Sequence, residues 1–365
     1  MTLLVLFAAV AAHACGCFAS SDAPVDQVGE RILFRQDGAN DWTAFVEVQF
    51  GCSQPNQDFA WLIPVQEGFD VNQDVRTAPA GLFDDLEQAT APRFGNGSDL
   101  LEYANLSSCN AATANELIAD QLDPLALTSD FLLGQAVVGP YEIELLEGDT
   151  DRLLDWLDDA GYQLPADADE PLQHYVDQGF QFLGVKLNPS ELSGPVETLV
   201  LDCGMTKPTV PLKLTAPAAT PDMPITVYVL GDERVTPAGV WSEVKPDLRG
   251  VIDAAGYHAA VLAEQERAGG RAWTVDYAAP AHKLLLNVKP ETAIELGHGG
   301  YITRLQAFVD PEEMDVDPVF VDDPKGPDVD VYKGQGPALA GTPWQPSSLA
   351  IGVFVLLGLR RRIGA

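Results

Sequence analysis

The amino-acid sequence predicts an α+β fold of mostly antiparallel β-sheet with a few helices. The clearest indication is residues 42–50, where apolar and polar side chains alternate strictly, as in a strand with one buried face. Strand patterns dominate the N-terminal part, and helical patterns alternate with strands from residue 149 onward. A boundary near residue 148, with two lobes that share an interface, is an alternative to one continuous domain.

Further strands are predicted where β-branched or apolar runs are bounded by Gly, Pro, Asn or Asp. These runs cover residues 32–34, 58–65, 135–145, 180–187, 196–202, 210–215, 225–230 and 301–308. Asp149 or Thr150 can cap a helix that ends at Gly161, and Pro171 fits the first turn of a second helix over 169–178. Further helices are predicted from about 256 to 268, over 79–91 and over 114–122.

The composition excludes several classes of protein. Of the 365 residues, 46% are hydrophobic, which argues against global disorder. The 54 acidic and 21 basic side chains give a net charge of −33, so no nucleic acid is expected as a partner. A lysine-poor, acidic exterior is typical of a protein that stays hydrated in a saline medium.

Residues 1–14 predict a signal peptide. The apolar run over 2–14 ends in Ala12, His13 and Ala14, the small-x-small pattern that a signal peptidase accepts. Its 13 residues would form a helix of only about 20 Å, which is too short for about 30 Å of hydrocarbon. Cleavage is therefore expected between Ala14 and Cys15. Lipidation of Cys15 is the less favoured alternative because His13 is bulky.

Residues 347–365 predict a hydrophobic membrane or sorting segment. Residues 349–359 are apolar and uncharged, and Arg360, Arg361 and Arg362 follow at once as a membrane stop. The positive-inside rule keeps these arginines in the cytoplasm and places the preceding chain outside. A short apolar stretch of this kind resembles the tripartite C-terminal sorting tags of bacterial surface proteins, which a membrane peptidase processes. A plain anchor is the alternative, and both place the exported protein in the cell envelope or at the cell surface.

Residues 310–346 predict an acidic, proline-rich stalk between the exported globular region, residues 15–309, and the membrane segment. Nine acids, two lysines and four prolines lie within 310–333, a composition that favours an extended, solvated chain. Alternating carboxylates, such as Asp315 with Asp317, offer calcium as an alternative, but the EF-hand spacing is absent. No other metal and no cofactor is expected.

Disulfides are the default for cysteines in an exported chain. The candidates are Cys17, Cys52, Cys109 and Cys203. Four cysteines allow three pairings, so the sequence leaves the connectivity open. Cys17 with Cys52, and Cys109 with Cys203, is the preferred arrangement.

The sequence contains none of the short motifs that mark common catalytic sites, such as His-Glu-x-x-His or Gly-x-Ser-x-Gly. The histidines that follow the signal peptide form no recognisable pair; they are His174, His258, His282 and His298. Adjacent acids, such as Asp84 and Asp85 or Asp158 and Asp159, fit solvated helix faces. The catalytic residues are therefore unknown.

Short motifs spread over residues 15 to 300 are similar to those of one bacterial family. They are CGCF at 15–18, GERILF at 29–34, DFAWLIPV at 58–65, ATAP at 89–92, GPY at 139–141, LLDWL at 153–157 with GY at 161–162, PLKLT at 211–215 and PDMP at 221–224. Taken together and in this order they resemble the bacterial domain of unknown function (DUF) 2330. The resemblance implies an exported surface protein and brings no activity or catalytic residue.

Two hypotheses about function follow. The first is an envelope-anchored, non-enzymatic binding or structural protein whose partners are the membrane, through its C-terminal segment, and the peptidases that process it. The second is a secreted hydrolase that acts on envelope or extracellular polymer through a carboxylate pair. The ligand or substrate is unknown in both.

Overall fold

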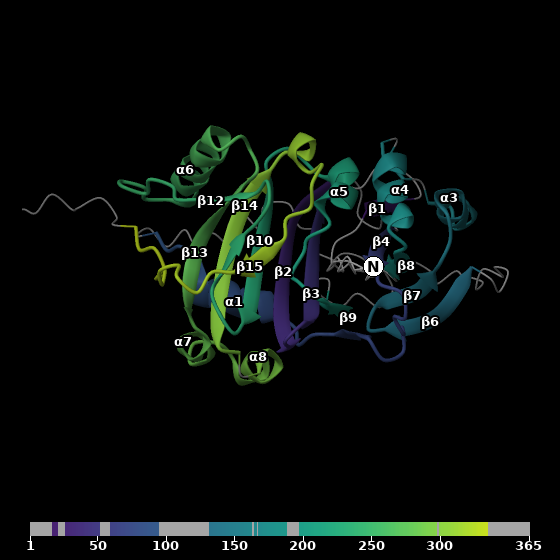
Figure 1. Cartoon of the computed structure of the whole chain (residues 1–365), viewed down its shortest axis with the longest axis horizontal. Helices are drawn as coiled ribbons and strands as arrows, with labels where there is room; N and C mark the ends of the chain where they lie inside the picture. Colours follow the sequence, from purple (N-terminus) through teal and green to yellow (C-terminus); the bar gives the residue numbers. More distant parts are fainter. Residues whose placement is uncertain are drawn as a thin grey trace, which may run out of the picture.

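The computed structural model describes residues 17–20, 26–51, 59–94, 131–187 except 163 and 166, and 197–334 except 298. These residues form a large and a small β-sheet with helices around them (Figure 1). The α+β class is therefore confirmed. The fold is one of packed sheets, in which strands far apart in the sequence lie side by side.

The large sheet has eight strands in the order β12-β13-β14-β10-β2-β3-β9-β5. Their bounds are β2 (Asp26–Gly38), β3 (Asp41–Gly51), β5 (Val75–Thr77), β9 (Leu199–Met205), β10 (Met223–Gly231), β12 (Ser242–Val244), β13 (Ala272–Pro280) and β14 (Tyr301–Val309). The sheet is mixed, because β10 runs parallel to β2 and β12 runs parallel to β13. Its other described pairings are antiparallel.

The small sheet has five antiparallel strands in the order β1-β4-β8-β7-β6. Their bounds are β1 (Cys17–Ser20), β4 (Phe59–Val65), β6 (Leu132–Val138), β7 (Tyr141–Leu146) and β8 (Gln181–Leu187). A two-stranded ladder of β11 (Val235–Pro237) and β15 (Phe320–Asp322) completes the described sheets. Each of the two main sheets takes strands from both sides of residue 148, so a division of the chain there is not reflected in the sheets.

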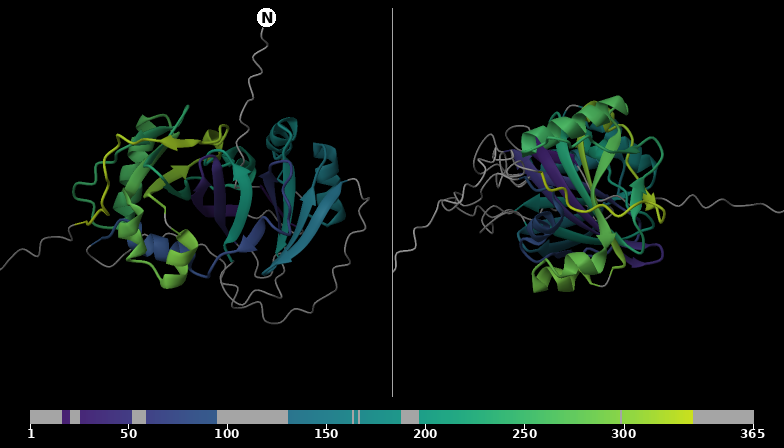
Figure 2. Two further views of the ribbon diagram at one scale, coloured as in Figure 1. Left: turned by 60° about the horizontal axis from the view of Figure 1, so that its bottom comes forward. Right: turned by 90° about the vertical axis from the view of Figure 1, so that its left-hand side faces the viewer.

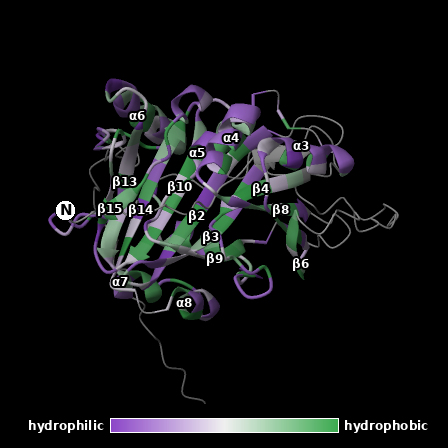
Figure 3. Ribbon diagram, turned by 45° about the vertical axis from the view of Figure 1, so that its right-hand side comes forward, coloured by the Kyte–Doolittle hydropathy of each residue, from purple (hydrophilic) through white to green (hydrophobic). Residues whose placement is uncertain are grey.

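Both sheets contribute to one hydrophobic core, which includes Val46 of β3, Ile63 of β4 and Leu305 of β14. The helices cover the opposite faces: α3 and α4 at the small sheet, and α1, α6, α7 and α8 at the large sheet (Figures 1 and 2). The helix bounds, with α5 included, are α1 (Leu82–Thr90), α3 (Thr150–Asp159), α4 (Asp169–Asp177), α5 (Leu212–Thr215), α6 (Ala254–Arg267), α7 (Ala281–Leu285) and α8 (Pro290–Leu296). The strands carry most of the hydrophobic colouring in Figure 3, as burial on two faces requires.

The helix signals in the sequence are confirmed where capping residues mark them. The Asp149 side chain accepts a hydrogen bond from the Arg152 N–H at 3.0 Å and caps α3, which Gly161 ends in the left-handed conformation. The ends of helices α1, α4 and α6 differ from the predicted ends by at most three residues. The predicted helix over 114–122 lies outside the described residues.

Several strand predictions need correction. Residues 212–215 form the short helix α5, and residues 135–145 form two strands joined by a turn at Gly139. Three elements of the structure, α7, α8 and β13, were not predicted from the sequence. Strand β3 is buried on both faces, because Phe45 packs under α1 while Val46 faces the shared core.

Helix α3 sits on the small sheet through Trp156, which is fully buried. Its indole N–H donates to Glu144 at 2.7 Å, and the Lys186 ammonium lies 4.8 Å from the ring centroid. Gly184 of β8 makes room for the ring, because a Cβ at that position would lie only 2.4 Å from the indole. A glycine in mid-strand here therefore serves helix packing.

The predicted stalk is wrong for residues 310–334, which form a strap along the globule, called here the C-terminal strap. Its strand β15 pairs with β11, the Trp241 indole N–H donates to the carbonyl of Val316 at 2.8 Å, and the Gly334 N–H donates to the carbonyl of Arg93 at 2.8 Å. The strap acids bind cations and donors of the globule, which composition alone cannot reveal. Residues 335–346, the rest of the predicted stalk, lie outside the described residues.

Candidate functional site

The most unusual polar feature of the described residues lies on the large sheet beneath α1 and α6. Along β14, Ile302, Arg304, Gln306 and Phe308 point to the helix-covered face. Arg304 is 1% exposed, although an arginine is almost never fully buried without partners. The residues that surround it are called here the Arg304 cluster: Glu87, Thr226, Tyr228, Tyr257, Asp276 and Gln306.

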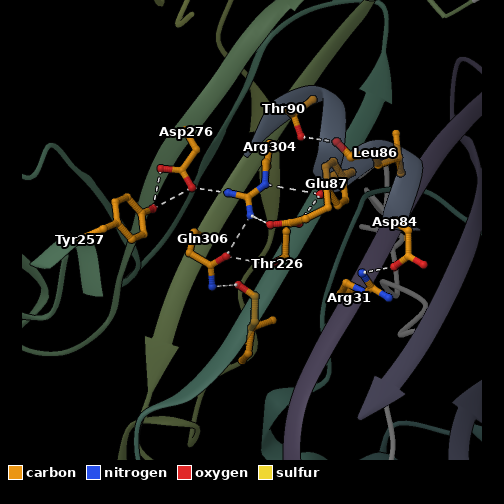
Figure 4. Close-up of polar contacts among 12 residues, drawn as sticks. Arg31, Asp84, Leu86, Glu87, Thr90, Thr226, Tyr257, Asp276, Arg304 and Gln306 are labelled. Atoms are coloured by element: carbon orange, nitrogen blue, oxygen red, sulfur yellow. Dashed lines mark hydrogen bonds and ion pairs between the residues drawn. The ribbon is translucent and has the colours of Figure 1, made fainter. Parts of the chain in front are cut away.

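Two carboxylates hold the Arg304 guanidinium between them (Figure 4). Its Nη2 lies 2.9 Å from Oε1 of Glu87, and its Nη1 donates to Oδ2 of Asp276. Each carboxylate also accepts from a tyrosine: the Tyr228 hydroxyl donates to Glu87 at 2.9 Å, and the Tyr257 hydroxyl donates to Asp276 at 2.6 Å. The cluster therefore joins α1 and α6 to β10, β13 and β14.

One cation faces two carboxylates in this cluster, and burial shifts the pKa of one of them, Asp276. Burial raises the pKa of Asp276 to about 6, although Arg304 and the Tyr257 hydroxyl pull it down. Burial by itself would lower the pKa of Arg304, but the charges of Glu87 and Asp276 outweigh it and hold that pKa well above its usual value. Asp276 is thus able to gain or lose a proton in mildly acidic conditions.

Asp276 makes the stability of the protein depend on pH. Its ordinary pKa is 3.8, so between about pH 4 and pH 6 the folded protein keeps a proton that the unfolded chain has released. The free energy of unfolding should fall as the pH rises through this window, by at most about 3 kcal/mol. Urea unfolding from pH 4 to pH 7 should show this fall in the wild type, and Asp276→Asn should lack it. Parallel curves for the two proteins would contradict the assignment.

A second ion-pair group ties the start of α1 to the large sheet. Arg31 of β2 donates through Nε to Glu47 of β3 at 2.8 Å, and its Nη1 lies 3.1 Å from Asp84 of α1. Burial raises the pKa of Glu47, against the lowering effect of Arg31. The neighbouring Asp85, expected on a solvated face, is instead buried and bonded to Thr292 of α8 at 2.6 Å. Asp84 is exposed, as predicted.

A second buried cation, Arg234, fastens the C-terminal strap. Its Nη2 lies 2.6 Å from Glu243, its Nη1 pairs with Asp323 of the strap, and its carbonyl accepts the Asp323 N–H at 2.6 Å. Gly326 packs against it so closely that a Cβ there would lie 2.5 Å from Nη1. The strap is therefore fixed at its centre by a buried arginine.

Three of the alternating acids of the strap, the residue type that suggested calcium, have partners within the protein. Asp315 accepts from Arg271, and Asp317 accepts the Tyr175 hydroxyl at 2.7 Å and the Lys213 N–H at 2.9 Å. Asp328 accepts the Tyr301 hydroxyl at 2.7 Å. Across the described ranges, no group of three or more His, Cys, Asp or Glu side chains is placed to hold a metal ion.

Most sequence-predicted sites lie where the structure does not describe them. Ala14, Cys15, Cys52, Cys109 and Arg360 to Arg362 fall outside the described residues. Cys17 belongs to β1 and Cys203 to β9, in different sheets, and their side chains are not described. The disulfide pairing therefore stays a prediction. Within the described part of the chain, no helix is long and apolar enough to cross a bilayer.

The Arg304 cluster was not predicted from the sequence, although the sequence contains one signal of it. Arg304 and Gln306 are polar residues that share a face with Ile302 and Phe308 in a predicted strand. Such a polar pair on an otherwise apolar face indicates either an exposed face or a buried network. Only the helices packed on this face decide between the two.

Comparison with known proteins gives one match. A family described as "Uncharacterized protein conserved in bacteria (DUF2330)" matches residues 9–321, which include all of the Arg304 cluster. No curated protein and no solved structure matches the chain.

Proposed function

The chain belongs to DUF2330, a family of uncharacterised bacterial proteins, and from this starting point we propose that it is an exported, envelope-anchored protein with a non-enzymatic binding or structural role at the cell surface. The two ends of the sequence support this location. Residues 1–14 have the pattern of a cleaved signal peptide, and residues 347–365 have that of a membrane anchor or a sorting tag cut by a membrane peptidase.

The observation that carries the proposal is the way in which the C-terminal strap is fastened. Arg234 holds its centre, and near its end the Tyr332 hydroxyl donates to the carbonyls of Leu248 and Val251 at 2.7 and 3.1 Å. The described part of the chain therefore ends at a fixed point beside Arg93. Such a fixed point suits a globule held by its C-terminus, since tension on the tail would be borne by ion pairs and a β-ladder.

A carboxylate pair for hydrolysis is the alternative, and the observation in its favour is the pair formed by Glu87 and Asp276, in which burial raises the pKa of Asp276. The two residues are 6% and 5% exposed, and the guanidinium of Arg304 occupies the space between them. A glycosidase needs its substrate in that space. The geometry of this pair therefore fits a structural clamp better than a catalytic dyad.

Cell fractionation with protease shaving tests the proposed location. In a bacterial host, the full chain should sediment with the envelope and should be cut by protease added to intact cells. A chain that lacks residues 347–365 should appear in a soluble exported fraction, because the membrane segment is gone. Its matched control, in which Arg360 to Arg362 are replaced by Gln, keeps the apolar stretch and separates the contribution of the basic stop. A protein that stays cytosolic and protected from protease would overturn the proposal.

A further inference from the structure

Strand β6 forms one edge of the small sheet, and within the described residues it pairs only with β7. Its exposed side chains alternate along one side of the strand as Leu133, Gln135 and Val137. Leu133 is 45% and Val137 is 78% exposed. An edge strand of this kind presents unpaired backbone N–H and C=O groups next to apolar side chains.

The edges of the large sheet differ from β6 in ways that prevent pairing. Strands β5 and β12 are each three residues long, and they carry the charged residues Arg76 and Glu243. Short length and charge are the usual protection of a sheet edge. Strand β6 has seven residues and contains neither a charge nor a proline, although the chain as a whole is 21% charged. The register shift in its pairing with β7 lies at its start, between Leu132 and Gly134.

We propose that β6 is a self-association surface, which pairs antiparallel with β6 of a second copy of this chain. The residues on its exposed side are self-complementary: Leu133 and Val137 stand two positions on either side of Gln135. A two-fold axis at Gln135 places Leu133 of one copy opposite Val137 of the other, as an isologous interface requires. The two small sheets then form one continuous ten-stranded sheet, with five strands from each copy.

Strand β6 itself carries no charge that would attract a basic or an acidic partner. Residues 131–141 form an uncharged window in a chain with a net charge of −33. Glu142 and Glu144 of β7 lie opposite Val137 and Gln135, so in a β6 pair these acids stand one strand away from the contact. A strongly basic partner would find no carboxylate on β6 itself. The repulsion between the two globules is long-range, and salt screens it: the Debye length falls from about 10 Å at about 0.1 M to about 3 Å at about 1 M. Association should therefore strengthen with salt.

Sedimentation of the full chain in a non-ionic detergent, at low and high NaCl, tests the proposal. The wild type should form a dimer whose dissociation constant falls as the salt concentration rises. Val137→Lys should raise that constant about ten-fold or more, since it puts a charge twice into the apolar contact. The added lysine lowers the net negative charge, so the loss cannot come from greater overall repulsion.

The matched control is Val240→Lys, which makes the same change at a valine that is 60% exposed and lies outside β6. This variant should dimerise as the wild type does. A wild type that stays monomeric under all conditions would overturn the proposal, even if the β6 edge bound an extended peptide. So would a dimer that Val137→Lys leaves intact, because contact through the C-terminal segments alone would explain it.

Discussion

Replacement of Arg304 by methionine should lower the free energy of unfolding by about 3–5 kcal/mol. The guanidinium is the cation bonded to Glu87 and Asp276 in a site that water does not reach. Without it, two carboxylates share a buried space, and one of them must take up a proton or the helices must move away. Urea unfolding followed by far-ultraviolet circular dichroism measures the loss.

The control for this variant is Arg249→Met. Arg249 also pairs with an aspartate, Asp247, but both side chains are exposed and water replaces the lost contact. Its unfolding midpoint should not differ from that of the wild type. An Arg304→Met protein as stable as the Arg249→Met protein would show that the cluster does not hold α1 and α6 to the sheet. A triple variant in which Glu87, Asp276 and Arg304 are replaced by apolar residues of similar size should recover part of the loss.

Replacement of Arg234 by methionine should detach the C-terminal strap and cost about 2–4 kcal/mol. Arg234 is 2% exposed, whereas its partners Asp323 and Glu243 are about one-third exposed and can turn to water, so the cost is smaller than for Arg304. The strap amides near β15 should exchange hydrogen faster, and protease should cut within residues 310–334. Mass spectrometry of the exchanged or cleaved peptides gives both results.

Arg271→Met is the matched control, because Arg271 also binds a strap acid, Asp315, but at the surface. Its loss should change stability by less than about 1 kcal/mol and leave β15 protected. If the wild type is itself cut readily within residues 310–334, the strap is not fastened as described. The extended stalk predicted from the sequence would then be the better account of this segment.

The sequence predicted those elements that local signals mark, such as a helix cap or a strict alternation of apolar and polar residues. Helix α3 is fixed by Asp149 and Gly161, and β3 by its alternation from Trp42 onward. Strand β13 was missed because Ala272–Pro280 is buried on both faces and includes Asp276, so it shows neither alternation nor a purely apolar run. The short helices α7 and α8 were missed because they have few residues and no side-chain cap.

The Arg304 cluster could not be predicted because its members come from α1, α6, β10, β13 and β14. Glu87 and Arg304 are 217 positions apart in the sequence, and no local pattern relates them. The same holds for Arg234 and Asp323, which are 89 positions apart. Long-range ion pairs depend on which strands become neighbours, and the strand order is not encoded in any single segment.

From the sequence alone one can infer the α+β class, the capped helices, the acidic character and the family, because each depends on composition or on residues close together in the chain. The targeting signals at both ends stay predictions. The folded arrangement sets where the charges act. It buried Arg304 between two carboxylates, turned the acids of 310–334 into the fastenings of a strap, and left β6 with an uncharged free edge in the described sheet. These features follow from the fold because the energy of a charge or of an unpaired strand edge depends on its neighbours in space and on its access to water.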